Sequence, residues 1–285
     1  MNKDTNFSSD KTVCCGKNLL TLSKPMVMGI LNCTYDSFFD GGKYTNEKAI
    51  IERAENILND GGNIIDIGAV SSKPGAMLLP IEEERNRLKP IISLLRKHLP
   101  DAILSVDTCW SEVAKTVVGE GADMINDISG GSFDEKMFET VAHLQVPYVL
   151  MHTRGLPSDM QKNTDYNNIV QEIIMYFSEK LNTLYRLGVK DVIIDPGFGF
   201  AKTLEQNYSL MKNLKDFSTF FKEPLLVGVS RKSMIYNLLN TDPNNALNGT
   251  TVLNTYALMN GAKFIRVHDV KEAVETIKII ETINK

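Results

Sequence analysis

The chain has 285 residues, 43% of them hydrophobic, and a formal net charge of −4. A chain of this length can bury a large core without disulfide or metal staples. A weakly acidic balance does not suit a nucleic-acid-binding protein, and any anionic substrate must be held by local cations. The four cysteines have neither zinc nor disulfide spacing. We find no secretory signal and no apolar run of ~18 residues, so we expect a cytoplasmic protein without a membrane partner.

Short runs rich in β-branched residues alternate along the chain with amphipathic stretches. The predicted strands cover 27–31, 63–67, 103–106, 124–126, 148–151, 192–194, 225–227 and 264–267. The predicted helices include 47–60, 81–98, 111–120, 167–187 and 271–283. Pro90 lies inside the second of these helices and would divide it in two.

About eight strand–helix units in about 260 residues are what a closed (β/α)8 TIM barrel requires. The alternative is an open doubly wound sheet, which usually carries a glycine-rich dinucleotide turn after an early strand. The Gly197–Gly199 pair lies late in the chain and opens no obvious helix. We therefore predict one barrel domain over residues 23–285, preceded by a flexible N-terminal extension over residues 1–22.

Polar residues follow nearly every predicted strand, at the barrel face where catalytic side chains gather. In strand order they are Asn32; Ser71, Ser72 and Lys73; Asp107; Asn126 and Asp127; His152 and Arg154; Asp195; Ser230, Arg231 and Lys232; and Arg266 and His268. Asp107, Asn126 and Asp195 can together bind the edge of a heterocycle that carries N–H groups. Lys232 can donate to a carbonyl or nitrogen of the same ring.

The remaining strand-end residues suit an anion. Arg266 and His268 are two residues apart and lie on one side of a strand, and Lys73 can join them. Asn32 offers a neutral oxygen to a hard cation such as Mg²⁺. The residue types thus predict a polar heterocycle deep in the barrel and a phosphate-like anion at its mouth, without naming a reaction.

Several of these residues have ordinary structural interpretations. Asp or Asn after a strand often caps the next helix, and a local turn explains Asp127 or Asp107 as well as a site does. His152 is equally compatible with a structural role. Asp66 lies inside an apolar strand, where a carboxylate without partners is costly. It is therefore either bonded to backbone and hydroxyl groups of the next loop or part of a site.

The motifs of the chain resemble those of dihydropteroate synthase, a family of folate biosynthesis. The resemblance runs from about Met28 to the C-terminus, and the motifs keep the order and approximate spacing of the family. They are MGILNCTYDSFFDGG (28–42), IIDIGAVSSKPGA (64–76), SVDT (105–108), NDISGG (126–131), VLMHTRGLPSDMQ (149–161), IIDPGFGFAKTLEQN (193–207), VGVSRKSMI (227–235) and RVHDVKE (266–272).

The resemblance implies a transferase that joins p-aminobenzoate to 6-hydroxymethyl-7,8-dihydropterin diphosphate, with Mg²⁺ as cofactor and a homodimer as the assembly. It implies pterin contacts from Asp107, Asn126, Asp195 and Lys232, diphosphate contacts from Arg266 and His268, and Mg²⁺ on Asn32. Aminobenzoate would lie near Ser230 and Phe200, with Ser72 and Lys73 at the aminobenzoate and anion edge, under a mobile lid over residues 33–42. Asp107, Lys232 and Arg266 would take the catalytic roles.

The second loop departs from the family pattern. Val70, Ser72 and Lys73 stand where the family usually has Glu, Thr and Arg, and Tyr35 and Phe39 replace Pro and Ser in the first loop. Lysine keeps the charge but loses the bidentate fork of arginine. We therefore predict an active synthase with altered handling of aminobenzoate and sulfonamides.

Two alternatives stay open: a non-catalytic pterin-binding homologue, and a pterin-dependent methyltransferase with a corrinoid partner. A methyl transfer needs no diphosphate pocket, so Arg266 and His268 argue against the second. For the expected homodimer, helix 271–283 has apolar residues at helical spacing. Ordinary packing against the barrel explains that pattern equally well.

Overall fold

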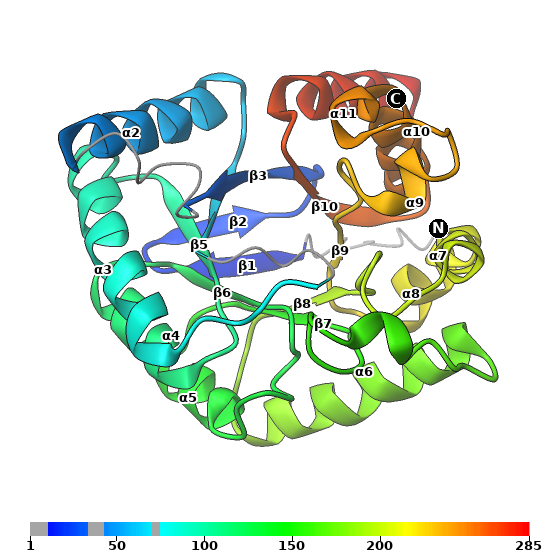
Figure 1. Ribbon diagram of the computed structural model, residues 1–285, viewed down its shortest axis with the longest axis horizontal. Coiled ribbons are helices and arrows are strands. Elements are labelled where there is room, and N and C mark those ends of the chain that lie inside the picture. The colour runs from blue at the N-terminus through cyan, green and yellow to red at the C-terminus, as the bar shows by residue number, and fades with distance from the viewer. Residues whose placement is uncertain (1–10, 34–42, 70–74, 285) are drawn as a thin grey trace, which may run out of the picture.

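A computed structural model describes residues 11–33, 43–69 and 75–284. Eight parallel strands close into a barrel in the order β10-β3-β4-β5-β6-β7-β8-β9, and the helices form a ring around them (Figure 1). The barrel strands are β3 (Met26–Asn32), β4 (Ile64–Gly68), β5 (Ile103–Asp107), β6 (Met124–Asp127), β7 (Tyr148–Met151), β8 (Val192–Asp195), β9 (Leu225–Val227) and β10 (Ala262–Val267). The predicted (β/α)8 barrel is confirmed, and each predicted strand overlaps one of these eight.

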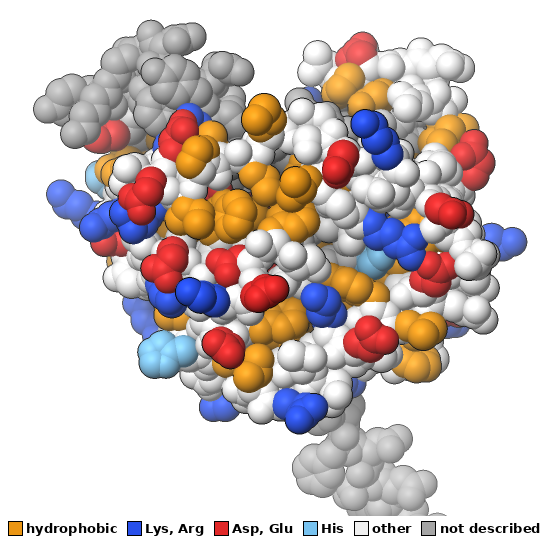
Figure 2. Space-filling model, turned by 60° about the horizontal axis from the view of Figure 1, so that its bottom comes forward, with side chains coloured by type: hydrophobic (Ala, Val, Ile, Leu, Met, Phe, Trp, Pro, Cys, Tyr) orange, Lys and Arg blue, Asp and Glu red, His pale blue; other side chains and the backbone are white. Residues whose placement is uncertain are grey.

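The helices lie outside the strands and bury their apolar faces against them. They are α2 (Lys43–Asn59), α3 (Ile81–His98), α4 (Ser111–Gly119), α5 (Met137–Leu144), α6 (Ile169–Arg186), α7 (Leu204–Lys212), α8 (Leu214–Phe220), α9 (Ser233–Tyr236), α10 (Leu247–Met259) and α11 (Val270–Ile283), with 3-10 turns η1 (Met160–Lys162) and η2 (Pro243–Asn245). Within the described ranges, none of them combines the length and hydrophobicity that crossing a bilayer requires. Acidic and basic side chains are interspersed over the face drawn in Figure 2.

The expected break at Pro90 is wrong, because α3 continues through this residue from Ile81 to His98. Proline removes one intrahelical hydrogen bond and clashes with the preceding turn. Here Pro90 lies on the exposed face, where water can satisfy the freed carbonyl group. Leu88, Ile91 and Leu95 are buried on the opposite face and hold the helix to the barrel.

The start of the described chain is a β-hairpin, where a flexible extension was expected. Strands β1 (Thr12–Cys15) and β2 (Asn18–Thr21) pair antiparallel around a turn at Gly16, which has φ 56°. Val13 and Cys15 are buried against residues from the lower part of the barrel interior. A buried aliphatic side chain contributes roughly 1.5–3 kcal/mol, so the hairpin plugs the bottom of the barrel and stabilises it.

The barrel interior has an apolar layer below and a polar layer above. The lower layer contains Met28, Ile64, Ile103, Met124, Val149, Ile193, Leu226 and Phe264, packed on the hairpin. Side chains two residues apart on a strand point to the same face. Asp66, Asn126, Asp195 and Arg266 each follow a member of this layer by two residues, so they too point into the barrel. The register of the strands thus places polar groups on a closed apolar floor.

Candidate active site

Asp66 is the centre of a polar network that spans four strands. Its Oδ1 accepts from the Ser105 hydroxyl at 2.6 Å, and its Oδ2 accepts from Asn126 Nδ2 at 3.0 Å and Arg266 Nε at 2.7 Å. Arg266 Nη2 also donates to Asp107 Oδ2 at 3.4 Å. Asp66 has no exposed surface. The costly buried carboxylate therefore has a hydroxyl, an amide and a guanidinium as partners, and it orients two of the predicted site residues.

Lys232 follows β9, and its side chain reaches the segment after β8. Its Nζ donates to the Phe198 carbonyl at 2.7 Å and lies 4.8 Å from the centroid of the Phe200 ring. Burial lowers the pKa of Lys232 to about 8, although Asp195 acts to raise it. Asp195 in turn accepts the Gly197 N–H at 2.8 Å. This part of the site therefore combines a half-buried ammonium group, a carboxylate and an aromatic ring.

Ser230 and His268 connect the loops after β9 and β10. The Ser230 hydroxyl lies 3.1 Å from His268 Nδ1 and accepts the His268 backbone N–H at 3.1 Å. Burial lowers the pKa of His268 to about 4, helped by Arg266 and Arg231, so this ring is neutral at pH 7. His268 thus offers hydrogen bonds to a ligand, whereas Arg266 supplies the positive charge.

The sequence and the fold match one family of enzymes. The model of the family described as "Pterin binding enzyme" matches residues 28–268. Dihydropteroate synthase of Synechocystis sp. is 41% identical over 260 residues, which is 90% of this chain and 89% of the relative. Dihydropteroate synthase of Escherichia coli K12 is also 41% identical, over 92% of this chain and 93% of the relative. This chain belongs to the dihydropteroate synthase family.

Solved structures of the family have the same fold. Yersinia pestis dihydropteroate synthase, solved as a sulfonamide drug complex, has a TM-score of 0.89 and 38% identity, with 96% of this chain and 99% of that chain covered. The Xanthomonas albilineans enzyme, solved with 4-aminobenzoic acid, has a TM-score of 0.89 and 34% identity, with 97% and 99% covered. Both similarities cover nearly the whole barrel.

Most of the site residues predicted for this dihydropteroate synthase family member lie together at one end of the barrel. They lie in three contact groups: Asp107, Asn126 and Arg266 around Asp66; Asp195, Phe200 and Lys232 at the end of β8; and Ser230 with His268. Asn32 is exposed at the end of β3. Ser72 and Lys73, like Val70, Tyr35 and Phe39, lie outside the described residues, as does most of the expected lid.

The pKa of Asp107 is subject to opposing effects of burial and of neighbouring charges. Burial raises its pKa to about 7, Arg266 lowers it, and Asp66 raises it further. A carboxyl group that titrates near neutral pH can donate or accept a hydrogen bond. Asp107 can therefore match either protonation state of a ring edge.

Asp127 is the last residue of β6, and its side chain binds the turn that follows, which confirms the structural alternative to a functional role. It is fully buried and accepts the backbone N–H groups of Ser129 and Gly131 at 2.7 and 2.9 Å and the Tyr148 hydroxyl at 2.5 Å. Three donors around one carboxylate leave little of it for a ligand.

Two residues of the site, Ser105 and Lys202, were not predicted from the sequence. Ser105 stands two residues before Asp107 on β5, so the strand period could have shown that both point inward. Lys202 is buried behind Phe200 and bonds to the backbone around it. It lies on an irregular segment, where no periodicity predicts the direction of a side chain.

Glu84 of α3 is a buried carboxyl group with a stability role that pH can reveal. It is 2% exposed, and its Oε1 has no hydrogen-bond partner among the residues that the structure describes. Burial raises its pKa from 4.5 to about 7, while Thr108 lowers it and Asp127 raises it. Because the folded state holds the proton more tightly, this group favours folding fully below about pH 4.5 and loses its contribution as pH rises through 7.

We therefore expect Glu84→Gln to flatten the decline of the free energy of unfolding between pH 5 and pH 8. A shift of this size corresponds to about 3 kcal/mol. Urea unfolding at both pH values measures it, with the exposed Glu139→Gln as control. A variant that declines as steeply as the natural chain would contradict the assignment.

Proposed function

We propose that this chain catalyses the condensation of 6-hydroxymethyl-7,8-dihydropterin diphosphate with p-aminobenzoate, giving 7,8-dihydropteroate and diphosphate in folate biosynthesis. The observation that carries the proposal is the buried polar layer, in which Asp107, Asn126, Asp195 and Lys232 surround one end of a closed barrel. Carboxylates, an amide and an ammonium group complement the mixed donors and acceptors of a pterin edge. The family membership supports the same reaction, and the complex of the Xanthomonas albilineans enzyme with 4-aminobenzoic acid supports the same arylamine substrate.

The residue types suit a dissociative reaction. The bond between the pterin methylene carbon and the diphosphate oxygen breaks first, and both electrons leave with diphosphate. The arylamine nitrogen then attacks the methylene cation and loses a proton. Asp107 and Asp195 would stabilise the cation, while Arg266 and His268 would hold the departing anion. The floor of the barrel excludes water from below.

Aminobenzoate would lie at the outer edge of this pocket. The aromatic ring of Phe200 lies 4.8 Å from Lys232 Nζ, and Ser230 precedes Lys232 by two residues on the loop after β9. A benzoate needs both a flat apolar contact and polar groups for its carboxylate. We assign Ser72 and Lys73 to the same edge on the family pattern. On the same pattern, the lid that the family has at residues 33–42 would cover the complex during reaction.

Asn32 would hold Mg²⁺. Its amide lies exposed at the end of β3, and among the described residues it makes no hydrogen bond, so its oxygen is available. One neutral oxygen suits a cation that keeps several waters and takes the rest of its ligands from substrate phosphates. When bound, Mg²⁺ would neutralise charge on the leaving diphosphate.

The cation requirement gives a direct prediction. We expect Asn32→Ala to raise the Mg²⁺ concentration for half-maximal activity roughly tenfold or more, since it removes the protein's oxygen ligand. The exposed Asn244→Ala serves as the control. Removal of Mg²⁺ by a chelator should abolish turnover in the natural chain. A variant with unchanged Mg²⁺ dependence would exclude Asn32 from the metal site.

A coupled synthase assay tests the proposed function. The purified protein should form dihydropteroate from the two substrates with Mg²⁺. Tight binding of pterin diphosphate without turnover would favour the non-catalytic homologue. Methyl transfer from a folate to a corrinoid protein would favour the methyltransferase. A folded barrel with neither binding nor turnover would reject all three.

The changed second loop supports altered sulfonamide sensitivity. Val70 and Lys73 together replace a Glu and an Arg that the family usually has, and a lost charge-assisted hydrogen bond costs roughly 1.5–3 kcal/mol. We expect the double variant Val70→Glu, Lys73→Arg to shift the sulfonamide inhibition constant relative to the KM for aminobenzoate. An unchanged ratio would remove these positions from drug discrimination.

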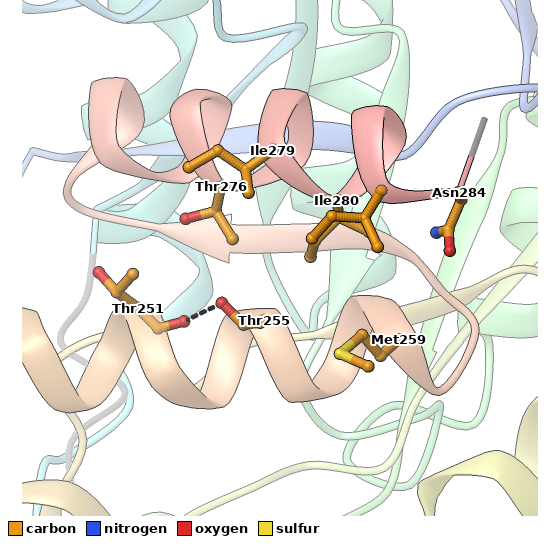
Figure 3. A pocket seen from close by; sticks show the side chains of 8 residues that line it. Thr251, Thr255, Met259, Thr276, Ile279, Ile280 and Asn284 are labelled. Atoms are coloured by element: carbon orange, nitrogen blue, oxygen red, sulfur yellow. Dashed lines mark hydrogen bonds between the residues drawn. The ribbon is translucent and has the colours of Figure 1, made fainter.

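We also propose a cytoplasmic homodimer that forms through α10 and α11. A shallow groove between these helices is lined by Thr251, Thr255, Met259, Thr276, Ile279, Ile280, Ile283 and Asn284 (Figure 3). Met259, Ile279 and Ile283 are 71%, 61% and 75% exposed. Adjacent exposed apolar side chains favour a partner surface. Sedimentation equilibrium should show a dimer that Ile279→Asp weakens and Leu19→Asp, at an exposed residue of the hairpin, does not.

A further inference from the structure

Lys202 carries a buried amine on the segment that joins β8 to α7. The residue is 3% exposed, and its Nζ donates to the carbonyl oxygens of Gly197 and Phe200, both at 2.9 Å. It also lies 3.1 Å from Nδ1 of the buried His152. The Lys202 Nζ therefore has three polar neighbours, two carbonyl oxygens to which it donates and one ring nitrogen. Lysine is almost never fully buried unless it is paired, so this arrangement calls for a function.

The segment that Lys202 holds has an irregular backbone. Gly197, Gly199 and Ala201 have φ values of 72°, 81° and 49°, all in the left-handed region. Alanine rarely adopts this region, because its Cβ crowds the following carbonyl oxygen. Between the two carbonyls that face Lys202, the Phe198 carbonyl accepts from Lys232 Nζ instead. Lys202 thus fixes the backbone on both sides of the carbonyl that holds the site lysine.

The same segment joins three groups of the active site. The Gly197 N–H bonds to Asp195, and the ring of Phe200 lies beside Lys232 Nζ. The His152 backbone N–H donates to the Asp195 carbonyl at 2.9 Å and so connects the end of β7 to the same place. A shift of the Gly197 or Phe200 carbonyl would therefore move the hydrogen-bond acceptor and the ring that position Lys232.

We propose that Lys202 is a positioning residue of the pterin pocket: by binding the Gly197 and Phe200 carbonyls from behind, it places the Phe198 carbonyl and the Phe200 ring that orient Lys232. It acts on the substrate only through these groups. The inference rests on the proposed function, because it takes the pocket around Lys232 to be the pterin site.

Lys202→Met tests the inference, since methionine keeps the length of the side chain and removes the donors. We expect the Kd for a hydroxymethylpterin, measured by calorimetry, and the KM for its diphosphate to rise roughly tenfold or more. The control is Lys212→Met, the same change at an exposed residue of α7, which should leave both values unchanged. A purely structural role would lower the melting temperature of Lys202→Met and leave the Kd of the folded protein as it was, and that result would overturn the proposal.

The coupling to Lys232 gives a second readout. In a Lys232→Ala background, adding Lys202→Met should change pterin affinity by a smaller factor than it does in the natural chain, because its route of action is already lost. Equal factors in the two backgrounds would contradict the proposed route.

If Lys202→Met does not fold, Lys202→Arg takes its place. Arginine keeps hydrogen-bond donors at this position, but its longer side chain cannot reach both carbonyls without moving the segment. We expect this variant to fold and to show a several-fold higher KM for the pterin diphosphate. A KM equal to that of the natural chain would overturn the inference. If the natural chain itself does not bind pterin, the proposed function fails instead.

Discussion

Lys232→Ala should abolish tight pterin binding while leaving the barrel folded. Lys232 Nζ lies between the Phe198 carbonyl, the Phe200 ring and the charge of Asp195. Loss of a hydrogen bond from a charged donor costs roughly 1.5–3 kcal/mol, which is a factor of about 10 to 150 in affinity. The desolvation that lowers the pKa of Lys232 disappears with the amine, so stability should change little or rise.

Calorimetric titration with a hydroxymethylpterin measures this effect, and thermal unfolding checks the fold. Lys215→Ala, at an exposed residue of α8, is the matched control and should bind like the natural chain. Because the pKa of Lys232 is lowered to about 8, its charge is partly lost above that pH. Pterin affinity of the natural chain should therefore fall between pH 7 and pH 9, and the fall should be absent in Lys232→Ala. Unchanged affinity in that variant would remove Lys232 from the pterin site.

The barrel could be predicted because its signals are local and repeated. Each predicted strand is a short apolar run such as 192–194, and each is followed by a polar residue and a helix. Because strand ends meet at one face of a barrel, the positions of Asp195 and Lys232 after their strands were enough to predict that both lie in one pocket. The hairpin over 12–21 lacked such a signal, since four-residue strands with mixed polarity become stable only when they pack on the barrel floor.

The hydrogen-bond partners of Asp66 could not be predicted from the sequence, for a different reason. Its hydrogen bonds reach residues 39, 60 and 200 positions away, and only the closed strand order brings them together. Arg266 seemed from its position to be a free anion ligand. The structure shows that two carboxylates already compensate its charge, so an arriving diphosphate has to compete with Asp66 and Asp107 for the same guanidinium. That competition would lower anion affinity and also keep the arginine rigid in the absence of substrate.

Asp66→Asn should be the most destabilising single change in the site. The amide that replaces the carboxylate offers one accepting oxygen where Ser105, Asn126 and Arg266 all donate. Breaking a buried ion pair by removing one partner costs about 3–5 kcal/mol, and the loss of the Asp66 carboxylate leaves the Arg266 guanidinium with only the longer 3.4 Å contact to Asp107. We therefore expect the free energy of unfolding in urea to drop by that amount, and activity to fall with it. Ser105→Ala, which removes only one neutral donor, should cost about 1 kcal/mol.

The decisive comparison is the double variant Asp66→Asn, Arg266→Met. If the cost of Asp66→Asn arises from an uncompensated guanidinium, then removing that guanidinium as well should recover part of the lost stability, and the two single costs should sum to more than the double cost. Simple additivity would mean that Asp66 stabilises the barrel through Ser105 and Asn126 alone. Activity should not recover in the double variant, because Arg266 would no longer be present to hold the diphosphate. The double variant would then recover stability without recovering activity. This result would mean that Asp66 holds in place the guanidinium that Arg266 presents to the substrate.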